Sequence, residues 1–260
     1  MKFAIAIVAA TISAGAAQAQ PGQCSARSGE RTAALVELYT SEGCDSCPPA
    51  DRWLSSLAGK GYARDRLVPI ALHVDYWDYI GWKDPYARSA FAGRQRKMAA
   101  LARASFVYTP QVLLQGKDFR GWGSGKFDEA VARINGEPAR ARIELSLDAS
   151  RKGAFLVQAR AAVPDPGLRA EAGFYLAAYE NKLVSRVTAG ENRGRTLEHD
   201  HVVLEWEGPI SFGASPAVAE KRELPLLPGA VTRNSGVVAF VQDRRSGEIL
   251  QALMLPACPG

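Results

Sequence analysis

The feature that most constrains the fold of this chain is a Cys-x-x-Cys motif placed directly after a short apolar run. Residues 33–39 (AALVELY) are typical of a buried strand, a turn follows, and Cys44 and Cys47 come next. Pro48 and Pro49 are tolerated only in the first turn of a helix, so a helix should begin at the cysteines. Two thiols placed there can close a disulfide, and the helix dipole favours the thiolate of the first. The motif predicts a redox dithiol with Cys44 outermost and Cys47 shielded.

The first nineteen residues predict a secretory signal peptide. Lys2 precedes an apolar run over 3–12, and small residues at 17–19 (AQA) provide a cleavage site before Gln20. The run is too short for a membrane-spanning helix, and no later segment reaches about 18 unbroken apolar residues. We therefore expect a mature protein that has no transmembrane segment and is secreted, with the periplasm as its compartment, where disulfides persist.

The composition is that of a globular protein long enough for two domains. Of the 260 residues, 47% are hydrophobic and 23% are charged, and the net charge of +5 is spread along the chain. The densest basic run, Arg94, Arg96 and Lys97, falls on a predicted helix beside apolar residues and is interpreted as a solvated face. The charge pattern therefore predicts no nucleic-acid partner.

Residues 32–136 alternate between strand-like and helix-like segments. The patterns predict strands at 33–39, 67–74 and 106–114 with a hairpin partner at 119–122, and helices at 47–58, 83–104 and 124–135. This order of elements resembles the thioredoxin fold. Thr109-Pro110 corresponds to the cis-proline that thioredoxin-like proteins place against their dithiol.

Four segments carry a more specific resemblance. They are 43–51 (GCDSCPPAD), 73–85 (HVDYWDYIGWKDP), 108–111 (YTPQ) and 190–197 (GENRGRTL). Together they resemble a family of secreted bacterial proteins of unknown function, whose members join a thioredoxin-like domain to a β-rich C-terminal domain. The resemblance implies an α/β thioredoxin-like domain over residues 32–136 and brings no established reaction.

Residues 140–258 have the pattern of an all-β domain. Period-two alternation and apolar runs predict strands at 142–148, 173–180, 201–206, 236–242 and 249–255, separated by Gly, Pro and Asn turns. We expect an antiparallel sandwich-like domain, joined to the first domain near Glu137-Pro138. This segment supplies no obvious catalytic set.

The dithiol predicts thiol–disulfide oxidoreductase activity without a cofactor. The Cys44 thiolate would attack a substrate disulfide and Cys47 would resolve the mixed disulfide. The expected partners are a protein or small thiol/disulfide substrate and a redox partner protein. The carboxylate of Asp45 opposes ionisation of its neighbour, so the pKa of Cys44 should be less depressed than a cation would make it.

Further residues are candidates for supporting roles around the dithiol. Glu37 occupies the strand position where thioredoxins keep a buried acid, which implies either a proton relay or an acid that is simply paired. Thr109 and Pro110 are expected to meet an extended substrate strand. Trp77 and Trp82 could line a substrate groove or could only pack as a lid.

Two readings compete with a redox function. The Cys44–Cys47 bond could be a permanent staple, or the pair could hold copper or zinc with His73 as a third ligand. Either reading would make the chain a non-enzymatic periplasmic metal-binding or interaction protein. His199 and His201 would share a face of a strand, but hydrogen bonding is favoured over a chelate, and we assign no metal site.

The remaining cysteines, Cys24 and Cys258, lie at opposite ends of the mature chain. Neither has a partner nearby in the sequence, and chain termini are often close in space. An oxidising compartment therefore favours a structural disulfide between them, with an intermolecular bridge as the alternative.

Overall fold

A computed structural model describes residues 22–258 of the chain, and strands dominate it. The predicted signal peptide lies outside the described residues. The largest sheet contains, in spatial order, β14 (Ile249–Pro256), β13 (Ser235–Asp243), β8 (Ala172–Glu180), β11 (Val202–Ser211), β3 (Leu67–His73), β2 (Ala34–Thr40), β4 (Gln111–Leu114) and β5 (Lys117–Asp118). Within residues 22–258, no helix has the length and apolarity needed to cross a bilayer.

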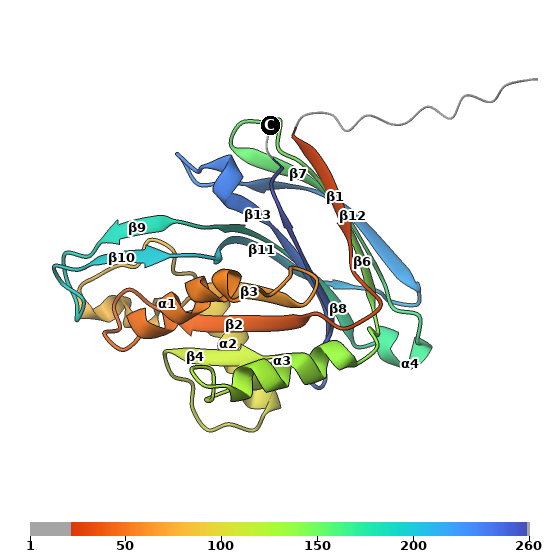
Figure 1. Ribbon diagram of the computed structural model, residues 1–260, viewed down its shortest axis with the longest axis horizontal. Coiled ribbons are helices and arrows are strands. Elements are labelled where there is room, and N and C mark those ends of the chain that lie inside the picture. Colours follow the sequence, from red (N-terminus) through yellow and green to blue (C-terminus); the bar gives the residue numbers. More distant parts are fainter. Residues whose placement is uncertain (1–21, 259–260) are drawn as a thin grey trace, which may run out of the picture.

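A second sheet and a hairpin complete the strands (Figure 1). The four-stranded antiparallel sheet runs β1 (Gln23–Arg27), β6 (Arg142–Asp148), β7 (Ala154–Ala162) and β12 (Ala217–Pro225), while β9 (Leu183–Arg186) pairs with β10 (Thr196–His199). The helices are α1 (Pro48–Ser56), α2 (Ser89–Leu101), α3 (Lys126–Gly136) and the short α4 (Pro166–Arg169), with 3-10 turns η1 (Leu57–Lys60), η2 (Asp75–Ile80) and η3 (Thr232–Asn234).

The expected fold class, an α/β thioredoxin-like domain followed by a β-sandwich-like domain, is wrong. Strands from both predicted segments form one large mixed sheet, because β3 pairs in parallel with β11. In that pairing Ala71 lies opposite Val202, and the Ala71 N–H donates to the carbonyl of His201 at 2.8 Å. The protein is therefore mostly β-sheet, and the sheet runs across the predicted domain boundary.

The eight-stranded sheet is covered on both faces, which explains why its central strands are apolar at consecutive positions. Along β8, Tyr175 and Tyr179 face the core beneath α2, whereas Phe174 and Leu176 face the four-stranded sheet. On that second face, α1 and α3 cover β2, β3 and β4. One helix layer and one mixed layer thus enclose the large sheet (Figure 1).

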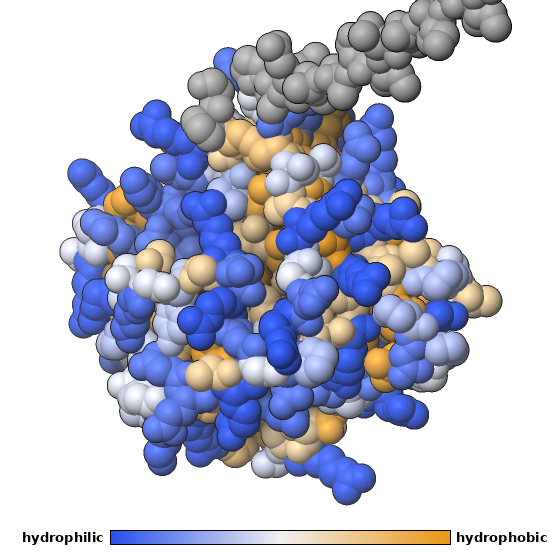
Figure 2. Space-filling model, turned by 45° about the vertical axis from the view of Figure 1, so that its right-hand side comes forward, coloured by the Kyte–Doolittle hydropathy of each residue, from blue (hydrophilic) through white to orange (hydrophobic). Residues whose placement is uncertain are grey.

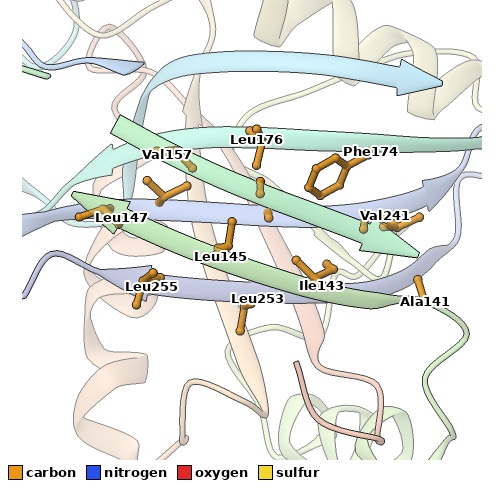
Figure 3. Packing of buried hydrophobic residues seen from close by; sticks show 14 of the residues in the cluster. Ala141, Ile143, Leu145, Leu147, Val157, Phe174, Leu176, Val241, Leu253 and Leu255 are labelled. Atoms are coloured by element: carbon orange, nitrogen blue, oxygen red, sulfur yellow. The ribbon is translucent and has the colours of Figure 1, made fainter. Parts of the chain in front are cut away.

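The core between the two sheets comes from alternating residues. On β6, Ile143, Leu145 and Leu147 point inward and meet Leu253 and Leu255 of β14 (Figure 3). The intervening residues of β6 are exposed. The face turned forward in Figure 2 carries many hydrophilic residues, and hydrophobic residues show between them in its upper middle and on its right.

Two predicted elements differ from the structure for local reasons. The expected hairpin partner at 119–122 is instead β5, because Gln115 (φ 53°) and Gly116 (φ 77°) form a two-residue turn that pairs Leu114 with Lys117. The expected helix at 83–104 is the shorter α2, preceded by η2.

Arg94 lies at the centre of the core beneath α2, which corrects its interpretation as part of a solvated face. Its guanidinium donates to both carboxylate oxygens of Glu37, at 2.6 and 2.9 Å, and the two side chains are 8% and 0% exposed. It also donates to Gln242 of β13 at 3.0 Å. Three aromatic rings surround it within 5.1–5.3 Å: Tyr175, Trp206 and Phe240. Its helix neighbours at 96 and 97 are exposed.

The two terminal cysteines are joined. Cys24 of β1 and Cys258, just beyond β14, form a disulfide with their Cα atoms 5.9 Å apart. The bond ties the edge of the four-stranded sheet to the edge of the eight-stranded one.

We predict that Arg94→Met lowers the free energy of unfolding by about 3–5 kcal/mol, because the carboxylate of Glu37 would stay buried without its cation. Chemical denaturation measures the loss. The matched control is Arg96→Met on the exposed side of the same helix, which should cost less than about 0.5 kcal/mol. Adding Glu37→Met to Arg94→Met should recover part of the loss. Equal losses for the two arginine variants would contradict this assignment.

Candidate functional site

The Cys-x-x-Cys motif lies where β2 ends and α1 begins. The Cys44 N–H donates to Ser41 and the Cys47 N–H donates to the carbonyl of Cys44, at 3.2 and 3.3 Å, so the backbone turns tightly into the helix. Pro48 and Pro49 occupy the first positions of α1, where a missing N–H costs nothing. The two cysteines are joined by a disulfide with a Cα–Cα distance of 5.5 Å.

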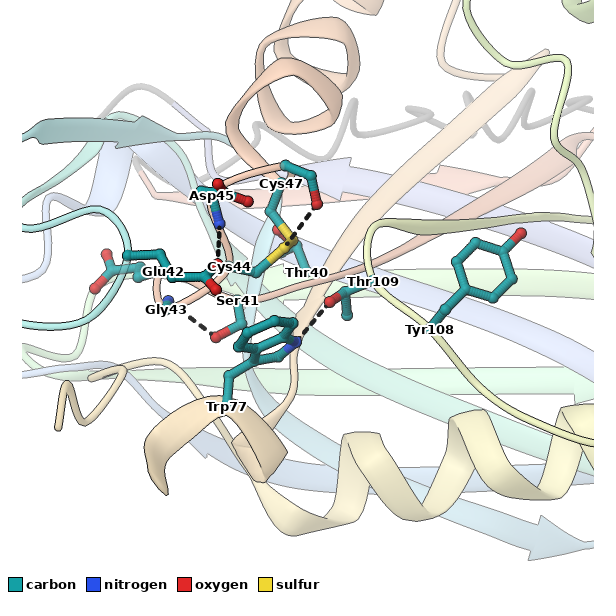
Figure 4. The surroundings of a disulfide bond; sticks show 12 residues. Thr40, Ser41, Glu42, Gly43, Cys44, Asp45, Cys47, Trp77, Tyr108 and Thr109 are labelled. Carbon is teal, nitrogen blue, oxygen red and sulfur yellow. Dashed lines mark hydrogen bonds between the residues drawn. A yellow bond between two sulfur atoms is a disulfide. The ribbon is translucent and has the colours of Figure 1, made fainter. Parts of the chain in front are cut away.

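Both sulfur-bearing residues are fully buried, so the expectation that Cys44 is the outer one fails for this closed state. Trp77 of η2 lies beside the pair, and its indole N–H donates to the Thr109 hydroxyl at 2.7 Å (Figure 4). The Thr109–Pro110 bond is cis, as predicted. Gly43 lies against Trp77, since a Cβ at position 43 would be 3.2 Å from the Trp77 Cβ. Trp77 therefore packs against the backbone at Gly43, next to the cysteines.

A second cover comes from the turn between β9 and β10. The Asn192 side-chain amide donates to the carbonyls of Glu42 and Cys44, both at 2.8 Å, and Asn192 is fully buried. Next to it, the Glu191 carboxylate accepts the Asp45 N–H at 3.0 Å. The sequence of this segment indicated only a resemblance to a family and predicted no role for it in the site. The available signal was a polar turn, GENRGR, too rich in hydrogen-bonding groups for a simple connection.

A cluster of buried ionisable groups lies behind the disulfide. The His73 Nδ1 is 2.7 Å from the Asp84 carboxylate, and His199 Nε2 is 3.1 Å from the Glu42 carboxylate. The two imidazole rings meet edge to face at 4.9 Å between centroids. Asp51, one helical turn beyond Cys47, accepts the Thr40 hydroxyl at 3.1 Å.

Burial and neighbouring charges shift these groups in different directions. Burial raises the pKa of Asp51, which favours its protonated form. Burial alone would lower the pKa of His73, but the Asp84 carboxylate outweighs it and the pKa is raised. In return, burial pushes the pKa of Asp84 upward and His73 holds it below its usual range. The cluster can therefore hold a proton and an ion pair close to the dithiol.

The other sequence-predicted residues are distributed as follows. Glu37 is simply paired, because Arg94 neutralises it on the opposite face of the sheet from α1. Asp45 is exposed and contributes its backbone N–H. The Trp82 indole N–H donates to the Glu42 carboxylate at 2.8 Å, which joins Trp82 to the buried cluster. His73 is hydrogen-bonded to Asp84, and within residues 22–258 no group of three or more His, Cys, Asp or Glu side chains is arranged to hold a metal ion.

His199 and His201 do not form a chelate. His199 belongs to the cluster with Glu42. His201 lines a separate cavity beside Tyr179, with its ring 6.1 Å from that ring. A turn at Asp200 and a left-handed backbone at His201 (φ 60°) separate the two side chains.

We predict that the His73–Asp84 pair makes folding stability depend on pH in a bell-shaped way. The raised pKa of His73 gives stability that is present below about pH 6.5 and is lost as the pH rises through the folded value. The lowered pKa of Asp84 gives stability that is present above about pH 4 and is lost as the pH falls through the folded value.

The variant Asp84→Asn should therefore lower the free energy of unfolding most, by about 3 kcal/mol, between about pH 4 and pH 6.5. The loss should be smaller at lower and at higher pH. Denaturation curves of both proteins across pH measure this difference. Asp65→Asn, at an exposed position, is the control and should change little at any pH. A constant difference across pH would show that the pair is not charged.

Comparisons with known proteins place the chain by family and by fold. The family model described as "Protein of unknown function (DUF1223)" matches residues 35–242. The prediction of secretion depends on the signal peptide at residues 1–19, which lies outside the described residues 22–258. No curated protein matches the chain.

Two solved structures are similar. A crystal structure of an Agrobacterium tumefaciens protein, a structural genomics target, is 24% identical with a TM-score of 0.62, covering 88% of this chain and 96% of that one. HBP35 of Porphyromonas gingivalis is 14% identical with a TM-score of 0.66, covering 88% of this chain and 76% of that one. These similarities support the overall fold alone.

Proposed function

We propose that this chain, which belongs to the DUF1223 family of proteins of unknown function, is a thiol–disulfide oxidoreductase that works through Cys44 and Cys47. The observation that carries the proposal is the position of the pair. The disulfide closes a short loop at the start of α1, where it can open and close without moving a strand. The helix dipole at such a place favours a thiolate.

In the proposed reaction, the reduced protein begins with a Cys44 thiolate. This thiolate attacks one sulfur of a substrate disulfide, forms a mixed disulfide and releases the other substrate sulfur as a thiolate. The Cys47 thiolate then attacks the Cys44 sulfur, closes the internal bond and releases the second substrate thiol. Two electrons pass from the protein to the substrate, and the reverse sequence oxidises a substrate dithiol.

The assignment of Cys44 as the attacking residue is supported by its neighbours. The hydroxyl of Ser46, an exposed residue, lies 3.3 Å from the Cys44 sulfur and could donate to a thiolate there. Cys47 is buried at the start of α1. Asp51 lies one helical turn after Cys47, in the first turn of α1.

Substrate access in this proposal requires Trp77 to move. Among the described residues, the Trp77 side chain makes one hydrogen bond, to Thr109, and its ring packs at the edge of the core beneath α2. Within the described residues, Thr109 makes no backbone hydrogen bond, so its peptide groups are free to pair with an extended substrate. Displacement of Trp77 would expose the Cys44 sulfur and the backbone of Thr109 together.

A purely structural disulfide is the second candidate, and the complete burial of both cysteines favours it. In that case the bond would only fix the start of α1 beneath the β9–β10 turn. For either candidate we propose a location outside the cytoplasm, without naming the compartment. It is supported by the pairing of all four cysteines in two disulfides.

We predict that the Cys44–Cys47 bond equilibrates with glutathione in the folded protein, at a reduction potential above about −300 mV. Thiol alkylation followed by mass spectrometry measures the reduced fraction in buffers of known potential. The Cys24–Cys258 bond of the same molecule is the internal reference and should remain oxidised, because it is a structural disulfide between two sheets.

Two variants identify the roles of the sulfurs. Cys44→Ser should abolish exchange, whereas Cys47→Ser should accumulate mixed disulfides with a small disulfide substrate. If the Cys44–Cys47 bond resists reduction as strongly as the Cys24–Cys258 bond does, the structural candidate is correct and the oxidoreductase proposal fails.

A further inference from the structure

A cavity of about 470 Å³ lies apart from the disulfide, between the segment that connects α1 to β3 and the strands β8 and β14. Its size is within the range of small-molecule sites in proteins. Part of its wall is apolar and comes from Leu57, Leu67 and Met254, three buried residues on separate elements. The cavity therefore offers an apolar ligand a surface that the fold holds in place.

The charge of this cavity is entirely of one sign. Arg64 and Arg233 both line it, and no acidic side chain does. Neither arginine forms an ion pair or a hydrogen bond within residues 22–258. The groove beside α3 differs, because Asp118 and Glu137 accompany its basic residues. Two exposed guanidinium groups without ion-pair partners, at one partly apolar cavity, favour an anion.

His201 supplies a third polar group to the same cavity. It is 8% exposed, and its Nδ1 has no hydrogen-bond partner among the described residues. Its backbone is fixed on both sides, since its N–H donates to Asn181 and its carbonyl accepts from Ala71, each at 2.8 Å. Burial lowers the pKa of His201 to about 4, so the ring is neutral at pH 7 and keeps one N–H donor.

We propose that this cavity binds a small amphipathic carboxylate. Its apolar part would pack against Leu57, Leu67 and Met254, and its carboxylate would accept hydrogen bonds from Arg64 and Arg233. The imidazole of His201 is over nine-tenths buried and its Nδ1 has no partner among the described residues, which lowers the stability of the ligand-free protein. A ligand that forms a hydrogen bond with this ring would remove that destabilisation. The site shares no residue with the disulfide site and does not depend on the redox proposal.

Isothermal titration of the full chain with sodium octanoate at pH 7 tests the site. We expect saturable binding of one octanoate per chain. Octanamide has the same apolar tail but no charge, and it should bind at least tenfold more weakly because it loses charge-assisted hydrogen bonds.

Variants then locate the binding. Arg64→Gln and Arg233→Gln should each weaken octanoate binding by about tenfold. His201→Asn, which suits the left-handed backbone, should also weaken it. The matched control is Arg142→Gln, an exposed arginine of β6, which should bind as the unchanged chain does. Thermal unfolding of each variant confirms that it is folded.

Three results would overturn the proposal. They are an absence of saturable octanoate binding, equal affinity for octanoate and octanamide, and unchanged affinity in both cavity arginine variants. Loss of binding in Arg142→Gln as well would show a general charge effect and would also count against the site. The redox state of Cys44–Cys47 should not change octanoate affinity, so failure here leaves the redox proposal standing.

Discussion

Arg94 joins two parts of the molecule that are far apart in sequence, because its guanidinium pairs with Glu37 and also contacts Gln242 and three aromatic rings from the C-terminal strands. Glu37 comes from β2, Arg94 from α2, and the surrounding rings from β8, β11 and β13. The backbone joint between these parts is short, because β3 and β11 share a single pair of facing residues. Side-chain contacts beneath α2 therefore supply much of what makes the eight strands one sheet.

The candidate site depends on the same joint. Its disulfide belongs to the segment after β2, whereas Asn192 and His199 come from the β9–β10 hairpin. The hairpin can reach the cysteines only because β11 lies next to β3, with β8 on the other side of β11. Any disturbance of the joint should therefore loosen the cover over the sulfurs before it affects the disulfide itself.

Local chemistry made several features predictable from sequence. Prolines after the motif indicated where α1 begins, and apolar runs located β2 and β3. Non-local pairing was not predictable, since nothing in the run at 201–206 identifies residue 71 as its neighbour. For the same reason, the sequence did not distinguish buried Arg94 from exposed Arg96. What separates them is the carboxylate of Glu37, which is distant in sequence and pairs with Arg94. The cover from Asn192 was missed because its partners are backbone carbonyls about 150 positions earlier.

During synthesis the ribosome delivers Cys24 first and Cys258 last. For most of that time Cys24 can meet only Cys44 and Cys47, whose own short loop closes far more readily than a longer one. Closure of the internal pair leaves Cys258 as the one cysteine of this chain with which Cys24 can pair. A bond between Cys24 and Cys258 consequently marks a chain that has been translated through residue 258, and a shortened product would carry an unmatched thiol at its first strand.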